Sequence, residues 1–369
     1  MTRRPWLYVS DSKLGGVGID QVTVEQLRAC AEAAVPLDLV ARGRSDLPGV
    51  RSHAWPLPPT KLLSWLPSQD YYALNKRFFG WLGPRYLADH AGVIAWSKTA
   101  LPLFEAAAKR GIPRLLNVGN LHCDHDGGVA QKTSRWPRIP LARYRAEYEL
   151  ATRILLPSEF AAQTFVAQGV PAEKLTVVHR GVDLARFVPL ADRPARPFVV
   201  ASCGHLGERK GSYRLLELWR KLALPDAELW LIGHVPDNEK AALEALAGPT
   251  VRFWGFRKDL PELLRQAHLH VLLSRNEGFA KVLLEAAACG VANLCTPEGG
   301  MPADAAGTLF VADRNDLDAV GAHLTRLHAD PAEADRLGRE ARAWVETRFG
   351  WAHFRRRVAE AVAAVEQAA

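Results

Sequence analysis

The sequence alternates short runs rich in valine, leucine and isoleucine with longer stretches whose apolar residues recur at helical spacing. Such alternation is typical of parallel sheets, because each parallel strand needs a helix-length connection to the next one. Twelve strands are predicted, six in each half of the chain. They are residues 6–10, 37–41, 92–97, 114–118, 154–158 and 175–179, then 198–203, 229–233, 251–254, 269–274, 291–295 and 308–311. The pattern therefore predicts two α/β domains.

A proline-rich segment separates the two groups of strands. Pro189, Pro194 and Pro197 punctuate residues 188–197, and proline favours extended connections, so this segment is predicted to be a linker. The N-terminal domain is placed at residues 1–188 and the C-terminal domain at 189–350. Residues 351–369, which follow Gly350, are predicted to form a last helix.

The net charge of +7 is distributed unevenly. Residues 1–190 contain 24 lysines and arginines and 16 acidic residues, a net charge of +8, whereas residues 191–369 carry −1. A basic half beside a neutral half indicates that one domain meets an anionic partner or a membrane surface. No nucleic-acid recognition motif accompanies the charge, so we expect no nucleic-acid partner.

The spacing of the cysteines and the length of the apolar runs exclude further classes of protein. Five cysteines without a C-x-x-C pair support neither a disulfide framework nor a zinc ribbon. No run approaches the roughly 18 apolar residues of a membrane span, and the apolar run near the start is too short for a signal peptide. We expect a cytoplasmic protein.

The sharpest local pattern joins a predicted strand ending at Ser274 to a helix beginning near Phe279. A turn with Glu277 and Gly278 lies between them, and Glu285 lies inside the helix. Amides at a helix N-terminus bind anions, and carboxylates accept hydrogen bonds from hydroxyls. A diphosphate flanked by two sugars fits this pattern. Taken alone, the pair could equally be two solvated glutamates at a helix end.

A second pattern, Gly204-His-Leu-Gly-Glu-Arg-Lys-Gly211, follows the strand predicted at 198–203. Its glycines allow the backbone to approach a ligand closely, and Arg209 or Lys210 can neutralise a phosphate charge. The spacing differs from the G-x-G-x-x-G fingerprint of dinucleotide-binding proteins.

Together the two patterns resemble the nucleotide-sugar domain of GT-B glycosyltransferases of family 4, which are retaining enzymes. That family has a G-R-x-x-x-x-K-G loop and an E-x7-E motif, and Glu277 and Glu285 have the spacing of the motif. Further matching segments are residues 157–160, 181–183, 231–233, 251–255, 299–300 and 348–351. The resemblance implies two Rossmann-like, doubly wound parallel-sheet domains that face an interdomain cleft, with residues 351–369 packing back on the N-terminal domain.

The resemblance also implies an activity. A hexosyl group would pass from a nucleoside diphosphate sugar to a hydroxyl acceptor with retention of configuration, and no cofactor or metal is expected. The acceptor would be a glycan, a lipid-linked molecule or another anionic component of the cell envelope. Peripheral contact with the inner face of the membrane, through the basic N-terminal domain, belongs to the same expectation.

The resemblance also implies roles for particular residues. Lys210 would pair with the donor diphosphate, Glu285 with the ribose, and Glu277 with hydroxyls of the transferred sugar. Glu277 and His122, which matches a histidine near the donor sugar, are the implied catalytic residues. The implied donor-binding residues are Gly15, Gly16, His205, Arg209, Lys210, Phe256, Gly278, Phe279, Ala280 and Glu285.

Two positions depart from the family pattern. His205 replaces an arginine that carries a permanent charge, and Ala280 replaces the second glycine of E-G-F-G. We expect Arg209 to supply the missing charge. The departures leave open a nucleotide-sugar binding protein without activity, and the fold leaves open an epimerase or a phosphorylase-like enzyme.

Three other segments have alternative interpretations. Residues 122–126 are all capable of binding a metal, but without a distant ligand pair they are predicted to line the cleft instead. Aromatic and basic residues interleave at 61–67 and 71–86, which indicates an interfacial helix or core helices with aromatic faces. Residues 131–138 form a basic loop that either holds an anionic acceptor or is solvated.

Overall fold

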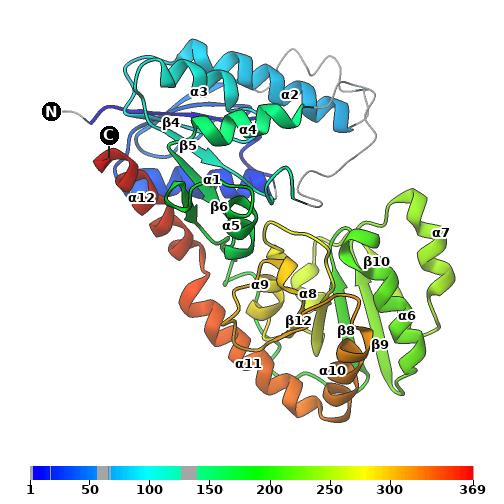
Figure 1. The fold of residues 1–369 in the computed structure, drawn as a ribbon. Coiled ribbons are helices and arrows are strands. Elements are labelled where there is room, and N and C mark those ends of the chain that lie inside the picture. The colour runs from blue at the N-terminus through cyan, green and yellow to red at the C-terminus, as the bar shows by residue number, and fades with distance from the viewer. Residues whose placement is uncertain (1–2, 17, 56–64, 66–67, 126–138, 369) are drawn as a thin grey trace. The chain divides into compact units, whose positions relative to one another are not determined.

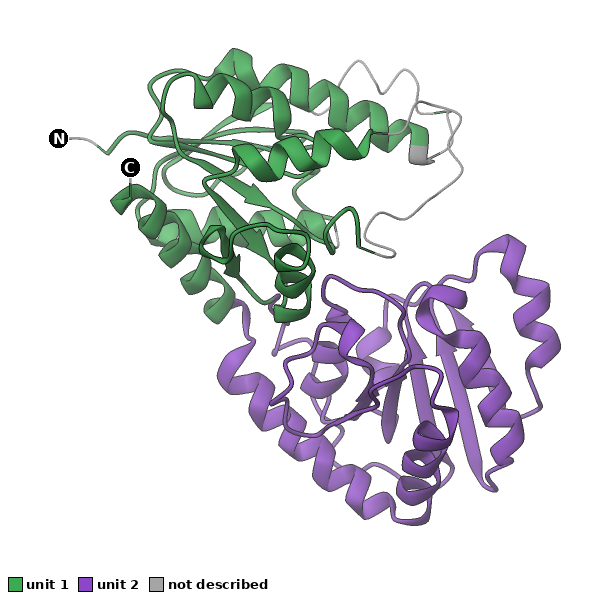
Figure 2. Ribbon diagram, viewed as in Figure 1, with its two compact units in different colours: residues 1–179, 352–369 green, residues 180–351 purple. Residues whose placement is uncertain are grey.

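Parallel sheets lie at the centre of both halves of the chain (Figure 1). The computed structural model describes residues 3–16, 18–55, 65, 68–125 and 139–368. It divides into two units, residues 1–179 with 352–369 (unit 1) and residues 180–351 (unit 2), which Figure 2 colours separately. The structure confirms the predicted α/β class, with two parallel sheets.

Unit 1 is built on a seven-stranded parallel sheet of order β3-β2-β1-β4-β5-β6-β7. Its strands are β1 (Trp6–Val9), β2 (Leu37–Ala41), β3 (Val50–Ala54), β4 (Gly92–Trp96), β5 (Arg114–Asn117), β6 (Arg153–Leu156) and β7 (Leu175–Val177). Its helices are α1 (Ile19–Glu32), α2 (Ser68–Leu82), α3 (Leu101–Ala108), α4 (Leu141–Leu150) and α5 (Glu159–Val166), with α12 (Trp351–Gln367) added from the C-terminus.

Helices cover both faces of this sheet, and β1 shows how. Leu7 and Val9 pack into a core with side chains of α2, α3, α4 and α5. Trp6 and Tyr8 point to the opposite face, where Trp6 Nε1 donates to Glu366 of α12 at 2.7 Å and the Tyr8 hydroxyl donates to Gln26 of α1. A parallel sheet covered on both faces has strands that are apolar throughout. The apolar runs of the sequence therefore predicted these strands.

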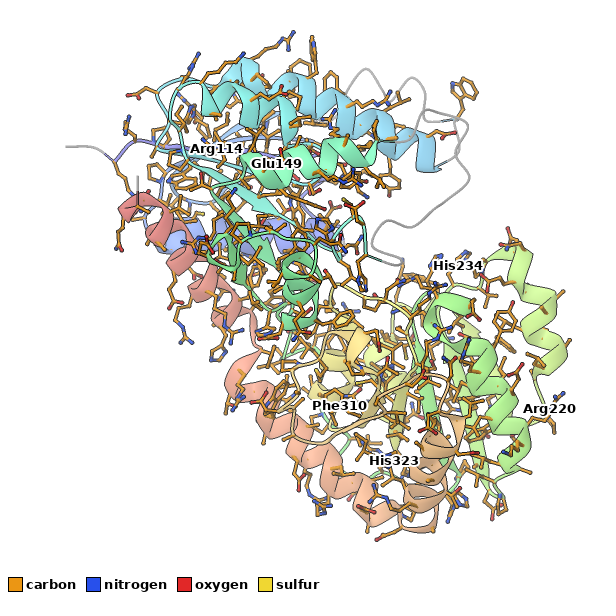
Figure 3. The ribbon with its side chains drawn as sticks, viewed as in Figure 1. Arg114, Glu149, Arg220, His234, Phe310 and His323 are labelled. Carbon is orange, nitrogen blue, oxygen red and sulfur yellow. The ribbon has the colours of Figure 1, made fainter. Side chains whose placement is uncertain are left out.

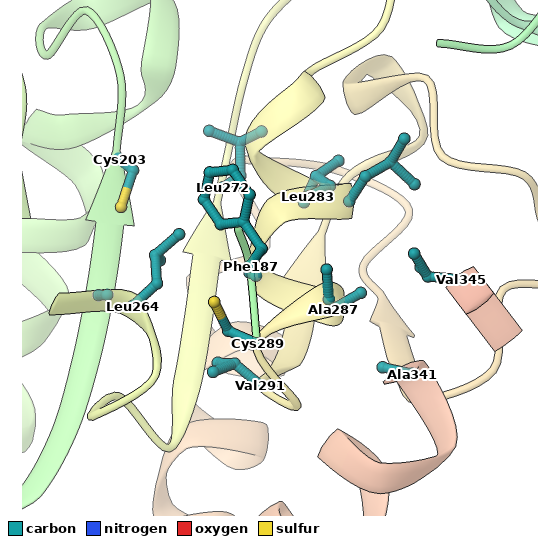
Figure 4. Close-up of a cluster of buried hydrophobic side chains, with 14 of the residues drawn as sticks. Phe187, Cys203, Leu264, Leu272, Leu283, Ala287, Cys289, Val291, Ala341 and Val345 are labelled. Carbon is teal, nitrogen blue, oxygen red and sulfur yellow. The ribbon is translucent and has the colours of Figure 1, made fainter. Parts of the chain in front are cut away.

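Unit 2 is built on a six-stranded parallel sheet of order β10-β9-β8-β11-β12-β13. Its strands are β8 (Phe198–Cys203), β9 (Ala227–Ile232), β10 (Val251–Gly255), β11 (Leu269–Leu272), β12 (Ala292–Cys295) and β13 (Thr308–Phe310). Its helices are α6 (Ser212–Leu222), α7 (Asp237–Leu246), α8 (Leu260–Leu264), α9 (Lys281–Ala288), α10 (Leu317–Ala329) and α11 (Pro331–Arg348). One core packs α8, α9 and α11 on the sheet, as Figure 4 shows, and the other packs α6, α7 and α10.

The predicted linker belongs to unit 2. The first boundary lies between His179 and Arg180, earlier than the expected one after Val188. The reason is that Val182 pairs with Gly350 and Phe187 is buried in the core of unit 2. Within the proline-rich segment, Arg193 forms an ion pair with Asp335 at 2.8 Å. Prolines here shape a segment that is held on one unit, and not a free connection.

One strand was missed by the sequence pattern. β3 has the sequence Val-Arg-Ser-His-Ala and is the edge strand next to β2. An edge strand is covered less than a central one, so its residues need not be apolar, and period-based prediction fails there. Among the described helices, none combines the length and the apolar composition needed to cross a membrane.

Two buried histidines make the stability of unit 2 depend on pH. Burial lowers the pKa of both His268 and His270 to about 4. The unfolded chain binds these protons near pH 6.5, so stability that is present above pH 6.5 is lost as the pH falls toward 4. The expected loss is about 3 kcal/mol per histidine.

Urea unfolding of the protein between pH 4 and pH 7 measures this dependence. His270→Leu should flatten the slope, and His234→Leu, at an exposed position, should not. If the free energy of unfolding of His270→Leu depended on pH as steeply as that of the wild type, His270 would not be a source of the pH dependence.

Candidate functional site

The two glycine- and glutamate-containing loops of unit 2 meet because β8 and β11 are neighbouring parallel strands. Their carboxyl ends lie at the same edge of the sheet, and the amide of Arg275 donates to the carbonyl of Arg209 at 2.9 Å. Gly211 has φ +74°, and a Cβ there would lie 2.4 Å from the carbonyl oxygen of Leu273. The close contact between the two loops therefore requires glycine at this position.

Glu277 is the centre of a charged cluster at this edge. Its Oε1 lies 2.7 Å from Lys210 Nζ, and Arg209 forms a second ion pair with the same oxygen. The Lys210 side chain is 8% exposed and the Arg209 side chain 44%. Burial lowers the pKa of Lys210, and the negative charge of Glu277 opposes that effect. The cluster is a set of two cations whose shared counter-ion is a single carboxylate.

Glu285 lies on α9, and Lys281 one turn earlier approaches its Oε1 at 3.1 Å. The Glu285 residue is buried, with 8% exposure. Glu285 therefore carries its carboxylate on a helix that begins just after Glu277. The E-x7-E spacing follows from this arrangement of turn and helix.

The Ala280 amide, at a position that the resemblance gives as donor-binding, is already engaged within unit 2. It donates to the carbonyl of Gly299 at 2.9 Å. Ala280 also has φ −79°, an ordinary value for any residue, so this backbone does not require the glycine of the family pattern. The substitution therefore introduces no strain. The neighbouring Gly278 and Phe279 complete the turn, with Phe279 9% exposed.

His205 and Phe256 lie on loops after β8 and β10. His205 is exposed and its ring lies 4.8 Å from the ring of His234, which follows β9 (Figure 3). Phe256 is 74% exposed, directly after Gly255. The three loops are linked through the backbone, since Leu206 donates to the His234 carbonyl and Gly233 to the Gly255 carbonyl. Both residues thus lie at the carboxyl edge that also carries the Glu277 cluster.

The remaining three predicted residues belong to unit 1. Gly15 and Gly16 are exposed on the segment between β1 and α1. His122 is 3% exposed, and its ring packs against those of Tyr148 and Phe165 at 5.0 and 4.9 Å. Burial lowers its pKa, which favours the neutral ring. His122 is among the residues that line a cavity of about 540 Å³.

The segment after His122 is poorly suited to a metal. Ligand atoms of His122, Cys123 and Asp124 lie within 4.8 Å of one another. However, both carboxylate oxygens of Asp124 accept hydrogen bonds from Arg145, at 2.8 and 2.6 Å. Burial raises the pKa of the Cys123 thiol to about 11, whereas metal binding needs the thiolate. Asp126 lies outside the described residues.

The aromatic and basic helix α2 has one buried aromatic face and other aromatic side chains that are exposed. Phe79 is fully buried in the core of unit 1, whereas Tyr72 and Trp81 are 58% and 54% exposed. The Arg85 guanidinium stacks on the Trp81 ring at 3.4 Å. Of the predicted segment 61–67, only residue 65 is described, and the predicted basic loop at 131–138 lies outside the described residues.

Sequence reasoning missed Lys98 and Glu147. Lys98 is the second residue after β4, and its amide donates to the buried Glu147 of α4. The available signal was the polar Ser97-Lys98-Thr99 at the carboxyl end of an apolar strand, where open α/β sheets bind ligands.

Two family models match the chain. The model described as Glycosyltransferase Family 4 matches residues 16–186, and the model described as Glycosyl transferases group 1 matches residues 191–344. Together with the two parallel-sheet units, these matches define the class as a two-domain glycosyltransferase. The chain belongs to the GT-B glycosyltransferases of the family 4-like type, as the two loops indicated.

Named relatives are enzymes of this class. The GDP-mannose-dependent alpha-(1-6)-phosphatidylinositol monomannoside mannosyltransferase of Mycolicibacterium smegmatis is 27% identical over 336 residues, covering 82% of each chain. The D-inositol 3-phosphate glycosyltransferase of Streptomyces bingchenggensis is 29% identical over an alignment of 250 residues, and the match covers 58% of this chain and 53% of that protein.

Solved structures share the fold over the whole chain. Sucrose-phosphate synthase of Thermosynechococcus elongatus superposes with a TM-score of 0.79 and 20% identity, covering all of both chains. Anabaena HepE, crystallised with UDP and glucose, superposes with a TM-score of 0.69 and 16% identity over 98% of this chain and all of that one.

Proposed function

We propose that this glycosyltransferase transfers a hexosyl group from a nucleoside diphosphate sugar to a hydroxyl acceptor, with retention of configuration. The observation that carries the proposal is the Lys210–Glu277–Arg209 cluster beside α9. A buried ammonium group and a guanidinium are suited to a diphosphate leaving group, because preorganised cations stabilise charge as it develops. The proposed reaction needs no cofactor.

The proposed role of Glu277 depends on an exchange of the counter-ion of Lys210 and Arg209. Lys210 and Arg209 are paired with its carboxylate. A bound diphosphate would replace Glu277 as their counter-ion, and the released carboxylate could then accept hydrogen bonds from the transferred sugar. Glu285 would bind the ribose, and the backbone beside Phe256 would read the base. Gly278 and Phe279 would approach the phosphate or the sugar.

The residues of unit 1 have proposed roles toward the donor and the acceptor. Gly15 and Gly16 would approach the diphosphate, and His122, neutral and at the border of a cavity, would contact the donor sugar. The relatives' names support a nucleotide-sugar donor and a phosphorylated inositol-type or glycan acceptor. The exposed Trp81, with Arg85 stacked on its ring, supports contact with an anionic membrane surface, which co-sedimentation with anionic vesicles tests.

Product analysis with a panel of nucleotide sugars and acceptors tests the transfer. The expected result is a glycosylated acceptor from one donor, with NMR of the first-formed product showing the anomeric configuration of the donor sugar. Inverted product would remove retention from the proposal. Donor binding without any turnover would instead support a nucleotide-sugar binding protein.

Arg209 should contribute to donor affinity, but modestly. It would supply the charge that His205 lacks, yet it is nearly half exposed, and exposed ion pairs are weakened by solvent. Arg209→Ala should weaken donor binding about three- to tenfold by calorimetric titration. Arg220→Ala, on the exposed side of α6 (Figure 3), serves as the control. Unchanged affinity in Arg209→Ala would show that Arg209 does not replace the missing arginine.

A further inference from the structure

A cavity of about 90 Å³ lies within unit 1 at the carboxyl ends of β4 and β5. Its lining includes Lys76 of α2, Lys98 after β4, and Asn117 and Asn120 at and after the end of β5. The sheet order changes direction between β1 and β4, since the chain builds outward to β3 on one side and to β7 on the other. Open α/β sheets bind ligands beside such a switch point.

Lys98 is held there in an unfavourable backbone conformation. Its φ is +80°, in the left-handed region that disfavours residues with a Cβ. The Lys98 amide donates to Glu147 Oε2 at 2.8 Å, and the Ser97 hydroxyl donates to the same oxygen at 3.0 Å. The fully buried Glu147 therefore fixes the turn. Strain of this kind persists where the surrounding structure enforces it, and such positions cluster at binding sites.

The two lysines that line the cavity differ in their close partners. Lys76 Nζ is paired with Asp11 at 2.9 Å, whereas Lys98 Nζ has no hydrogen bond or ion pair with any residue that the structure describes. Burial, and then the positive charge of Lys76, lower the pKa of Lys98, and the negative charges of Asp11 and Glu147 only partly oppose that effect. The Tyr144 ring, at 5.9 Å, offers only a weak contact. Lys98 is partly buried, and a partly buried cation without a close partner is favoured by a ligand that supplies the negative charge.

We propose that this cavity binds the phosphate group of a phosphorylated polyol acceptor, with Lys98 as its principal ligand and Lys76 as the second. Lysine binds phosphate as a point charge, and a phosphate dianion can neutralise two ammonium groups at once. The volume exceeds the roughly 10–15 Å³ that one water needs. That the phosphate belongs to the acceptor rests on the proposed function. The phosphate is carried either by a free phosphorylated polyol or by a phospholipid headgroup.

Calorimetric titration of the full chain with inorganic phosphate and with glycerol 3-phosphate tests the site. Lys98→Met should weaken binding of both about tenfold or more, whereas Lys109→Met, which removes an exposed lysine after α3, should leave it unchanged. Lys98→Gly removes the charge and the backbone strain together, so it keeps the test valid if Lys98→Met folds poorly. Equal affinity in wild type and both Lys98 variants would overturn the proposal, as would absence of binding in every arm, vesicles included.

A parallel arm with phosphatidylinositol vesicles separates the two sources. Loss of vesicle binding in Lys98→Met, without binding of the soluble phosphates by wild type, assigns the site to a lipid headgroup. Loss of soluble phosphate binding alone assigns it to a free polyol phosphate.

These assays need neither donor nor transfer, so the two proposals can fail separately. Phosphate binding through Lys98 in a chain that transfers no sugar would refute only the proposed function. Transfer that Lys98→Met leaves unchanged for phosphorylated and neutral acceptors alike would refute only the phosphate site.

Discussion

Replacing Lys210 with methionine should lower kcat/KM for sugar transfer by about 10²–10³-fold, mostly through kcat. The physical reason is that the Lys210 ammonium is buried, and charge interactions are stronger away from water. Its attraction for the diphosphate grows as the leaving-group charge develops. A methionine fills similar space, and Arg209 stays on Glu277 as its counter-ion.

Steady-state kinetics with saturating acceptor measure this effect. Lys221→Met, at the end of α6 with its side chain 73% exposed, is the matched control and should keep wild-type activity. A loss below tenfold in Lys210→Met would remove Lys210 from the proposed transition-state role. Glu277→Ala is a less informative variant, because it deprives the buried Lys210 of its counter-ion and so combines a folding defect with any loss of activity.

Replacing Glu147 with alanine should lower the free energy of unfolding of unit 1 by about 3–5 kcal/mol. Glu147 is fully buried, and its two oxygens accept from the Ser97 hydroxyl and from three backbone amides. Those amides belong to Lys98, Ala100 and Leu101, at 2.8, 3.1 and 3.2 Å. Alanine leaves these donors without an acceptor at the beginning of α3, and each buried unpaired donor is costly.

Urea unfolding followed by tryptophan fluorescence and by circular dichroism measures the loss. Glu149→Ala, two residues later on α4 and exposed (Figure 3), should change stability by less than about 0.5 kcal/mol. The loss of stability in Glu147→Gln should lie between the losses in Glu147→Ala and Glu149→Ala, because the glutamine amide keeps one acceptor oxygen. Wild-type stability in Glu147→Ala would show that the turn after β4 is held by other contacts.

The sequence predicted the α/β architecture well because parallel strands buried on both faces are apolar throughout. The runs at 37–41 and 198–203 coincide with β2 and β8. The edge strand β3 escaped prediction because it is only partly covered, and the prolines of 188–197 were misleading because the core position of Phe187 and the Arg193–Asp335 ion pair cannot be seen in local sequence.

The candidate site divides in the same way. The sequence patterns identified the two loops of unit 2, because glycines and glutamates at fixed spacing record local turn geometry, and their resemblance to family 4 indicated the class of enzyme. Only the tertiary structure decided which groups are already engaged: the Ala280 amide with Gly299, Asp124 with Arg145, and Glu277 with both cations. It also brought Lys98, Lys76 and Glu147 together from three separate segments. Such contacts depend on strand order and helix packing, which local sequence does not encode.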